Sequence, residues 1–171
     1  MNLHNKEIET RGKVLALSLK IEDSLNRILY NFFAQRSKDQ ETKSLFLQTI
    51  ILPLSFGQKI SLYKQILKTG RYQGKVLSKL KTEKDFPVSD LNEFIQLVQK
   101  NLSQIVLIRN YIAHGNDISD AFLALEEDEV VFMKKADIMK VSGKSLEEFS
   151  NLIYQTYILL DITHGDLIDR D

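Results

Sequence analysis

The sequence predicts a mainly helical protein: an up-and-down bundle of four to five helices with a small β-hairpin before the last helix. Two long stretches repeat apolar residues every three or four positions, which is the signature of amphipathic helices. Only seven glycines and two prolines interrupt the 171 residues. Helices that each bury one apolar stripe need one another for cover, so a bundle is the expected arrangement.

The first half of the chain contains three predicted helices. The first covers residues from about Glu7 to Ala34, and a short apolar run from Leu45 to Leu52 forms the second. Ser55 is the expected N-cap of a third helix from Phe56 to about Leu67, which Gly70 ends. The polar and basic residues 71–86 are expected to connect this helix to the next with about one helical turn.

The second long helix follows Ser89, its expected N-cap, and keeps a helical period to His114, with Gly115 as its stop. Its apolar positions are Leu91, Phe94, Ile95, Val98, Leu102, Ile105, Ile108 and Ile112.

An inserted hairpin and loop are expected over residues 117–144. Ala121–Leu125 and Val130–Met133 have the pattern of two short strands around the acidic turn Glu126–Glu129. A last helix is predicted from Lys144 to near Gly165.

Length and composition fit a single domain over residues 1–171. The apolar fraction of 43% and the charged fraction of 27% are close to globular averages. The sequence contains no cysteine, which excludes disulfides, thiol catalysis and thiolate metal sites and fits a reducing interior. Without a leader or an apolar run of about 18 residues, we expect a cytoplasmic protein with no membrane contact.

The charge is unevenly distributed although the net charge is zero. A zero sum argues against a protein that binds nucleic acid with its whole surface. From Phe56 to Lys84, however, eight basic residues stand against one acid, Glu83, and acids outnumber bases from Asp117 onward. The basic segment could collect phosphates locally, or it could be a solvated lysine-rich helix and loop.

The stretch Leu107 to Gly115, L-I-R-N-Y-I-A-H-G, brings three polar side chains to the end of an apolar helix. On an ideal helix, Arg109 lies within about 20° of Val98 and Leu102, so it is expected in the middle of the buried stripe. A charge there needs an anionic partner or a water-filled cleft. Asn110 and His114 share a neighbouring face.

These three side chains could form a site that cleaves phosphodiesters. Histidine can move a proton to or from a 2′-hydroxyl or a leaving 5′-oxygen, and arginine can stabilise the charge on the phosphoryl oxygens. Neither a metal nor another cofactor is needed for this chemistry. The alternative is structural: a core arginine paired with an acid such as Glu22, and a histidine at an ordinary helix end, since His-Gly recurs at His164.

The segment Arg109 to His114, R-N-Y-I-A-H, resembles the R-x4-6-H motif of HEPN domains, in which a small polar residue often follows the arginine. The segment Leu54 to Ile60 upstream is similar to an arrangement in many small bacterial HEPN-like proteins. The resemblance implies a helical homodimer that pairs two copies of the motif in one cleft and cuts RNA without metal. It assigns catalytic roles to Arg109, Asn110 and His114.

The resemblance leaves the biological role open. Many HEPN proteins are toxins of toxin–antitoxin or phage-defence systems, which implies an antitoxin as partner; others are inactive and serve as binding modules. The chain is also similar to mannitol operon repressor-like proteins, whose helical region ends in Arg-Asn-x-x-Ala-His, and that likeness implies a non-catalytic regulatory protein.

Three further residues are candidates for RNA contact. Lys59 and Lys64 belong to the basic segment, and Tyr111 is next to the motif, where it could stack on a base or pack in the interior. The sequence has no glycine-rich phosphate loop, zinc-ligand spacing, Ser-His-Asp order or dinucleotide fingerprint, which excludes most common enzyme classes.

Overall fold

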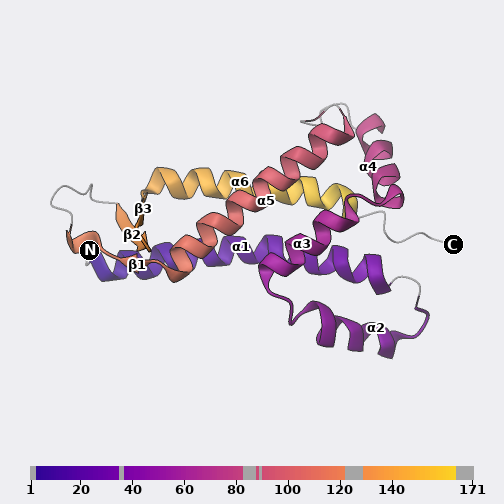
Figure 1. Cartoon of the computed structure of the whole chain (residues 1–171), viewed down its shortest axis with the longest axis horizontal. Helices are drawn as coiled ribbons and strands as arrows, with labels where there is room; N and C mark the ends of the chain where they lie inside the picture. The colour runs from indigo at the N-terminus through magenta and orange to yellow at the C-terminus, as the bar shows by residue number, and fades with distance from the viewer. Residues whose placement is uncertain (1–2, 35–36, 83–87, 89, 122–128, 165–171) are drawn as a thin grey trace. The chain divides into compact units, whose positions relative to one another are not determined.

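The computed structural model describes residues 3–34, 37–82, 88, 90–121 and 129–164 (Figure 1). The described residues are mainly helical, and a small antiparallel sheet precedes the last helix, as the sequence predicts. The α-helices are α1 (Leu3–Ala34), α2 (Gln40–Phe46), α3 (Phe56–Ile66), α4 (Gly70–Thr82), α5 (Leu91–His114) and α6 (Gly143–His164). The strands are β1 (Asn116–Asp117), β2 (Val130–Lys134) and β3 (Asp137–Val141).

The chain forms two compact units. The first consists of Met1–Lys20 and Ser103–Gln155, and the second of Ile21–Leu102 and Thr156–Asp171. The helices α1, α5 and α6 each contribute residues to both units. The single domain expected over residues 1–171 stays a prediction.

The predicted long helices α1, α5 and α6 are confirmed, because their apolar positions recur at helical spacing and are buried. In α1, Val14 is buried in the first unit, and Ile21, Leu25 and Ile28 are buried in the second, all at 0% exposure. In α5 the start is fixed by Asp90, whose carboxylate accepts a 2.9 Å hydrogen bond from the backbone nitrogen of Glu93. The expected N-cap Ser89 lies outside the described residues.

The predicted start of α3 is confirmed in detail. The Ser55 hydroxyl accepts a 3.3 Å hydrogen bond from the backbone nitrogen of Gln58, and the Gln58 side-chain oxygen accepts one of 2.8 Å from the backbone nitrogen of Ser55. This reciprocal pair is a capping box, which satisfies two amides that the helix itself leaves without partners.

The expected connection at residues 71–86 is wrong over its described part, because Gly70–Thr82 forms the helix α4. Gly70 likewise begins α4 instead of ending α3, which stops at Ile66. Tyr72 and Val76, one helical turn apart, are 1% and 0% exposed, and this narrow apolar face is enough to dock the helix. The hydroxyls of Tyr63 and Tyr72 lie 2.7 Å apart and join α3 to α4.

The sheet has the order β1-β2-β3, and both pairings are antiparallel. The predicted strand at Val130–Met133 is confirmed, but its hairpin partner is β3, with Phe132 opposite Met139. The tight turn between them places Lys135 at a φ of 58°. The other predicted strand is wrong at Ala121, which ends a 3-10 helix (Ser119–Ala121). Its remainder, residues 122–125, lies outside the described part, as does most of the acidic turn.

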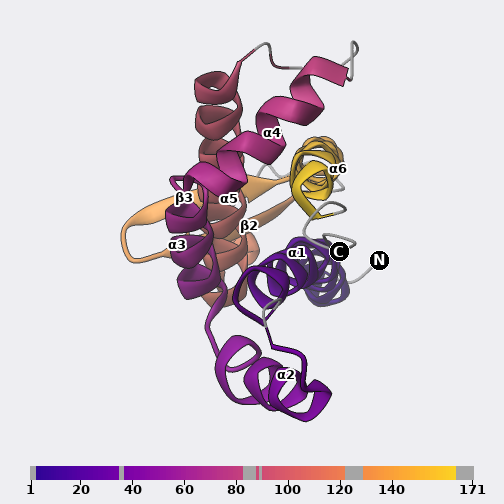
Figure 2. The same ribbon diagram turned by 90° about the vertical axis from the view of Figure 1, so that its right-hand side faces the viewer.

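The predicted apolar helix at Leu45–Leu52 is confirmed as the end of α2 and a short π-helix, Leu47–Ile51. Ile51 is buried, whereas Leu45, Ile50 and Leu52 are 60%, 49% and 50% exposed. Figure 2 shows α2 at the edge of the second unit, below α3.

Within the described ranges, no single helix has both the length and the hydropathy of a membrane span. Among those residues one pair of helices, Gln40–Ile51 and Phe56–Ile66, meets both criteria together but is bent by 117°.

Candidate functional site

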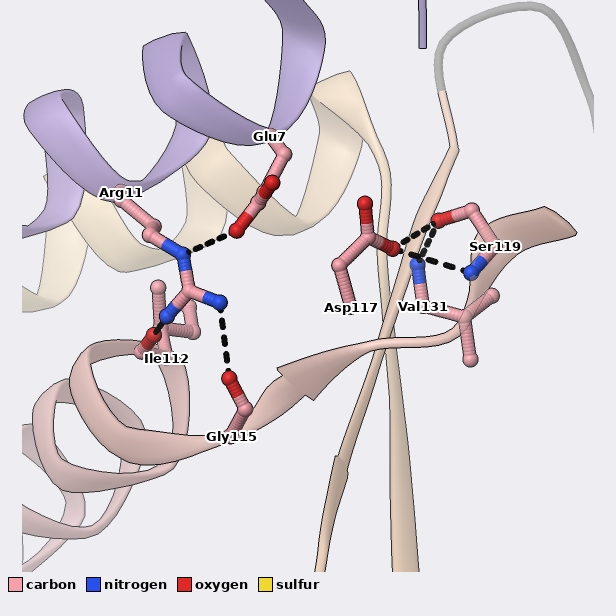
Figure 3. Close-up of polar contacts among 7 residues, drawn as sticks. All are labelled: Glu7, Arg11, Ile112, Gly115, Asp117, Ser119 and Val131. Carbon is pink, nitrogen blue, oxygen red and sulfur yellow. Dashed lines mark hydrogen bonds and ion pairs between the residues drawn. The ribbon is translucent and has the colours of Figure 1, made fainter. Parts of the chain in front are cut away.

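The helix end that carries the motif is held by an arginine from α1. The guanidinium of Arg11 donates hydrogen bonds to the backbone carbonyl oxygens of Ile112 and Gly115, and the second bond, from Nη2, is 2.7 Å long (Figure 3). The last carbonyls of a helix have no partners within it, and they form the negative end of its dipole. Arg11 therefore satisfies two of these acceptors with a positive charge.

Arg11 is itself fixed from two other sides. Its Nε donates a 2.7 Å hydrogen bond to the Glu7 carboxylate, one turn earlier on α1 (Figure 3). Its guanidinium carbon lies 4.7 Å from the centre of the Phe132 ring, which is a cation–π distance. The side chain thus links α1, the end of α5 and β2.

A second cation binds the same helix end. Lys134, the last residue of β2, donates a 3.0 Å hydrogen bond from Nζ to the backbone carbonyl oxygen of Asn110. Two basic side chains therefore neutralise the last turn of α5.

Gly115 allows the chain to turn closely from α5 into the sheet. Its backbone nitrogen donates a 2.7 Å hydrogen bond to the carbonyl oxygen of Tyr111, and the residue is buried. A Cβ atom at this position would lie 2.6 Å from that oxygen and 3.3 Å from the Cβ of Phe132. Only glycine leaves room for this approach.

The residues after Gly115 are fixed by a buried serine. Asp117 accepts hydrogen bonds from the backbone nitrogen and the hydroxyl of Ser119, at 2.9 and 2.6 Å, and the Ser119 hydroxyl accepts a 2.9 Å bond from the backbone nitrogen of Val131 (Figure 3). The backbone on both sides of His114 is therefore anchored.

The three motif side chains have different environments. Arg109 and Asn110 are half-buried, and His114 is exposed on the last residue of α5. The expectation that Arg109 is buried in the middle of the stripe is wrong, although Val98 and Leu102 on that line are fully buried. A long arginine can cover apolar surface with its stem while its charged end reaches water. Arg109 also makes contacts of its own, so it is not an isolated charge.

Lys59 is not a surface cation, contrary to its expected role in RNA contact. It is 2% exposed, and its Nζ lies 2.7 Å from a carboxylate oxygen of Glu22 in the second unit. Because its charge is buried and paired, RNA could reach it only by opening the core. Lys64, five residues later on α3, is half-buried.

Tyr111 does not present its ring for base stacking. It is 8% exposed, and its hydroxyl is a buried group without a hydrogen-bond partner among the described residues. From the sequence, Tyr111 could either stack on a base or pack in the interior, and its burial favours packing.

No cluster of three or more histidine, aspartate or glutamate side chains lies within the described residues in a position to hold a metal ion. What the motif offers is one exposed imidazole, one half-buried guanidinium and one half-buried amide. This set can transfer a proton and bind an anion.

A separate cavity of about 490 Å³ lies in the first unit against the other side of α5. It is lined from α5 by Gln104, Ile108 and Ile112, and from β3 and α6 by side chains such as Lys140 and Phe149. Arg109, Asn110 and His114 do not line this cavity. On an ideal helix they lie about 100° to 240° around from Ile108.

Comparison of the chain with protein-family models, curated proteins and solved structures finds no match.

Arg11 and Lys134 are the residues of this site that the sequence did not reveal. Arg11 follows Glu7 by four positions, which reads as an ordinary surface ion pair on a helix. Its bonds to residues more than one hundred positions away have no local signature. Lys134 stands in a pair of lysines whose only sequence signal is the end of a strand.

Proposed function

We propose that this protein is a HEPN-like, metal-independent ribonuclease in which Arg109 and His114 act on the phosphodiester. One observation carries the proposal: His114 is exposed and Arg109 half-buried at a helix end where Arg11 and Lys134 already bind the carbonyls of Ile112, Gly115 and Asn110. Neither side chain is therefore needed as a cap of α5, and the helix-end role that would explain His114 without catalysis is already filled.

Each residue has a defined task in the proposed reaction. The imidazole of His114 takes the proton from the 2′-hydroxyl or gives one to the leaving 5′-oxygen. The guanidinium of Arg109 binds the phosphoryl oxygens, where negative charge builds up in the transition state. Asn110 orients either the imidazole of His114 or the guanidinium of Arg109 through its side-chain amide.

The proposal includes a homodimer that brings two copies of the motif to one cleft. It is supported only by the likeness of R-N-Y-I-A-H to the HEPN motif. Light scattering coupled to size-exclusion chromatography should give twice the 19.8 kDa mass of the chain. A monomer at every concentration tested would remove the shared cleft from the proposal.

The decisive experiment is RNA degradation in EDTA by the wild type, Arg109→Ala and His114→Ala. We expect each variant to lose at least about 100-fold in rate, the lower range for a general acid or base. Arg27→Ala and His164→Ala are matched controls, since Arg27 is exposed on α1 and His164 repeats the His-Gly pair in the sequence. Undiminished cleavage by both motif variants, or no cleavage by the wild type, would rule out the proposed ribonuclease activity.

A non-catalytic regulatory or interaction protein is the second candidate, because Leu45, Ile50 and Leu52 are large apolar side chains that face solvent. Contiguous exposed apolar patches often mark protein–protein contacts. Induced expression in bacteria separates the two candidates. Growth arrest that His114→Ala abolishes favours the nuclease, and arrest that depends on Leu45 but not on His114 favours the interaction protein.

A further inference from the structure

The helical segment Gln40–Ile51, formed by α2 and the π-helix that continues it, is poorly covered by the rest of the chain. All of its residues are described, and Ile51 is the one that is buried. A helix of about a dozen residues is marginal in water, and in proteins most of its stability comes from the packing of an apolar face. The N-cap Asp39 stabilises the first turn, but further packing is needed to hold the segment.

Large apolar side chains gather on this segment and beside it. Leu45, Ile50 and Leu52 are 60%, 49% and 50% exposed. Phe33, near the end of α1, is 46% exposed, and its ring centre lies 6.2 Å from that of Phe46 in α2. All of these residues belong to the second unit. We call the four exposed residues Phe33, Leu45, Ile50 and Leu52 the α2 face.

The α2 face is large enough for a small protein–protein contact. A large apolar residue has roughly 150–200 Å² of surface, so the exposed fractions of the four residues amount to roughly 300–400 Å². A specific interface covers about 800 Å² on each partner, and a little more than half of that area is apolar. The face therefore supplies most of the apolar area that such an interface needs.

The chain that forms most of the face lacks charge. Residues 44–58 contain no aspartate, glutamate, lysine or arginine, and no other stretch of the sequence without these residues is as long. Charged residues are depleted at the centre of protein interfaces. An uncharged surface does not repel a second copy of itself, and it has no complementarity to a strongly acidic or basic partner. The face is therefore suited to another uncharged apolar surface, and each copy of the chain has one.

We infer that the α2 face is covered by the α2 face of a second copy of this chain. The proposed function includes a homodimer without a contact surface, and the choice of a second copy over another protein rests in part on it. In a two-fold dimer the same patch is used on both partners, so the two faces form one apolar contact. Each segment Gln40–Ile51 then receives the packing that it lacks alone.

A membrane surface is the competing ligand, and the charge of the segment argues against it. A helix that lies in the surface of a bilayer is rich in lysine and arginine on its polar face. The segment Gln40–Ile51 has one base, Lys43, against one acid, Glu41. The next helix, α3, adds no exposed apolar face, because Phe56 and Ile60 are 4% and 5% exposed.

The mass of the full chain in solution tests the contact. Light scattering coupled to size-exclusion chromatography follows the wild type between about 1 and 500 μM, a range that suits a small interface. Leu45→Glu places one carboxylate on each side of the contact and should raise the dissociation constant at least about 100-fold. The variant should keep the monomer mass of 19.8 kDa where the wild type has twice that mass.

Hydrogen exchange gives a second measurement at the segment itself. In the wild type, the amides of Gln40–Ile51 should become more protected as the protein concentration rises through the dissociation constant. In Leu45→Glu they should stay at the level of the dilute wild type. Protection that does not change with concentration in a dimeric wild type would place the contact elsewhere and overturn the inference.

Two exposed leucines outside the face provide matched controls: Leu19, 53% exposed on α1, and Leu107, 61% exposed on α5. Leu19→Glu and Leu107→Glu should keep the wild-type mass, and thermal melting followed by circular dichroism should show that all three variants are folded. An equal effect of the three substitutions would mean that added charge alone dissociates the dimer, which would overturn the inference. Dissociation by Leu107→Glu but not by Leu45→Glu would move the contact to α5 and overturn it as well.

The remaining outcomes separate this inference from the nuclease. If Leu45→Glu is a monomer that cleaves RNA at the wild-type rate, the contact stands and the shared cleft of the proposed function fails. If the wild type dimerises through the face but cleaves no RNA, the contact stands and the proposed reaction fails. A Leu45→Glu variant with the wild-type mass overturns the contact alone, whereas a wild type that is monomeric at every concentration overturns both the contact and the shared cleft. A monomeric wild type that binds vesicles of phosphatidylcholine with about 30% phosphatidylserine would replace the second copy by a membrane.

Discussion

Nη2 of Arg11 lies 2.7 Å from the carbonyl oxygen of Gly115, and the two residues are 104 positions apart in the chain. The bond joins the third turn of α1 to the residue that follows the end of α5. Helix ends in proteins are usually closed by nearby residues, whereas here the end next to the candidate site is closed from a distant helix.

Replacing Arg11 with alanine should lower the free energy of unfolding by about 2–4 kcal/mol, because two hydrogen bonds from a cation to helix-end carbonyls are lost. Arg11→Lys should recover only part of this, since an ammonium cannot span both oxygens as a fork does. Urea unfolding measures the change. Lys13→Ala, whose side chain is 54% exposed and pairs with Glu9, should cost less than about 0.5 kcal/mol. Equal losses at the two sites would contradict the assigned role of Arg11.

Gly115→Ala should destabilise the protein by about 1–3 kcal/mol, because the new methyl group would lie 2.6 Å from the carbonyl oxygen of Tyr111. The matched change Gly12→Ala, in the middle of α1, has no atom within 4 Å of the new methyl and should stabilise by about 0.5–1 kcal/mol. Thermal melts of the two variants should therefore shift in opposite directions. A neutral Gly115→Ala would show that the backbone between Tyr111 and Gly115 can shift without cost.

Tyr111→Phe should leave RNA cleavage unchanged and raise stability by up to about 1 kcal/mol. The change removes a buried hydroxyl that has no partner among the described residues. Unfolding and cleavage are measured on the same preparation. A loss of RNA affinity or of cleavage rate would indicate that Tyr111 contacts the substrate.

Glu22→Leu should cost about 3–5 kcal/mol, because the buried ammonium of Lys59 would lose the carboxylate 2.7 Å away. The double variant Glu22→Leu, Lys59→Met removes both charges and should recover most of that loss. Urea unfolding of the two single variants and the double variant gives the coupling energy. Additive losses would mean that the pair contributes nothing as a pair.

Asp39 should make the start of α2 sensitive to acid. Hydrogen bonds from the Thr42 side chain and backbone and from the Glu41 backbone lower the pKa of the Asp39 carboxyl below its usual value. A carboxyl with a lowered pKa in the folded state stabilises it above the pKa of the unfolded chain, and this stabilisation is lost as the pH falls through the folded value. NMR titration should give Asp39 a pKa below the usual aspartate value. The amides of α2 should lose protection from exchange as the pH falls through that pKa, and Asp39→Ala should remove this pH-dependent loss.

The parts of the fold that the sequence predicts are those whose apolar positions repeat over many turns. In α1 and α5 the repeat covers several turns, so single exceptions do not obscure it. Among the α4 residues whose burial is described, only Tyr72 and Val76 are buried, and the segment is rich in lysine, so composition suggests a connection. The actual hairpin turn has Lys135 at positive φ, where asparagine or glycine would have given a signal.

At the candidate site, helical geometry placed Arg109 too deeply, because the residue is half-buried. A helical wheel gives the angle at which each side chain leaves the helix, and it says nothing about how far a long side chain extends toward water. Arg11 could not be predicted, because its partners are backbone oxygens, which every residue possesses. Contacts of that kind depend on the tertiary fold, not on a sequence pattern.

The division of the first unit between two distant segments of the chain has a consequence for synthesis on the ribosome. Its N-terminal part, Met1–Lys20, is made first, but Ser103–Gln155 are needed to complete it. At about 5–20 residues per second, Arg11 waits roughly 5–20 s before Ile112 and Gly115 exist to bind it. The helix end beside His114 therefore closes late in translation, after most of the second unit has been made.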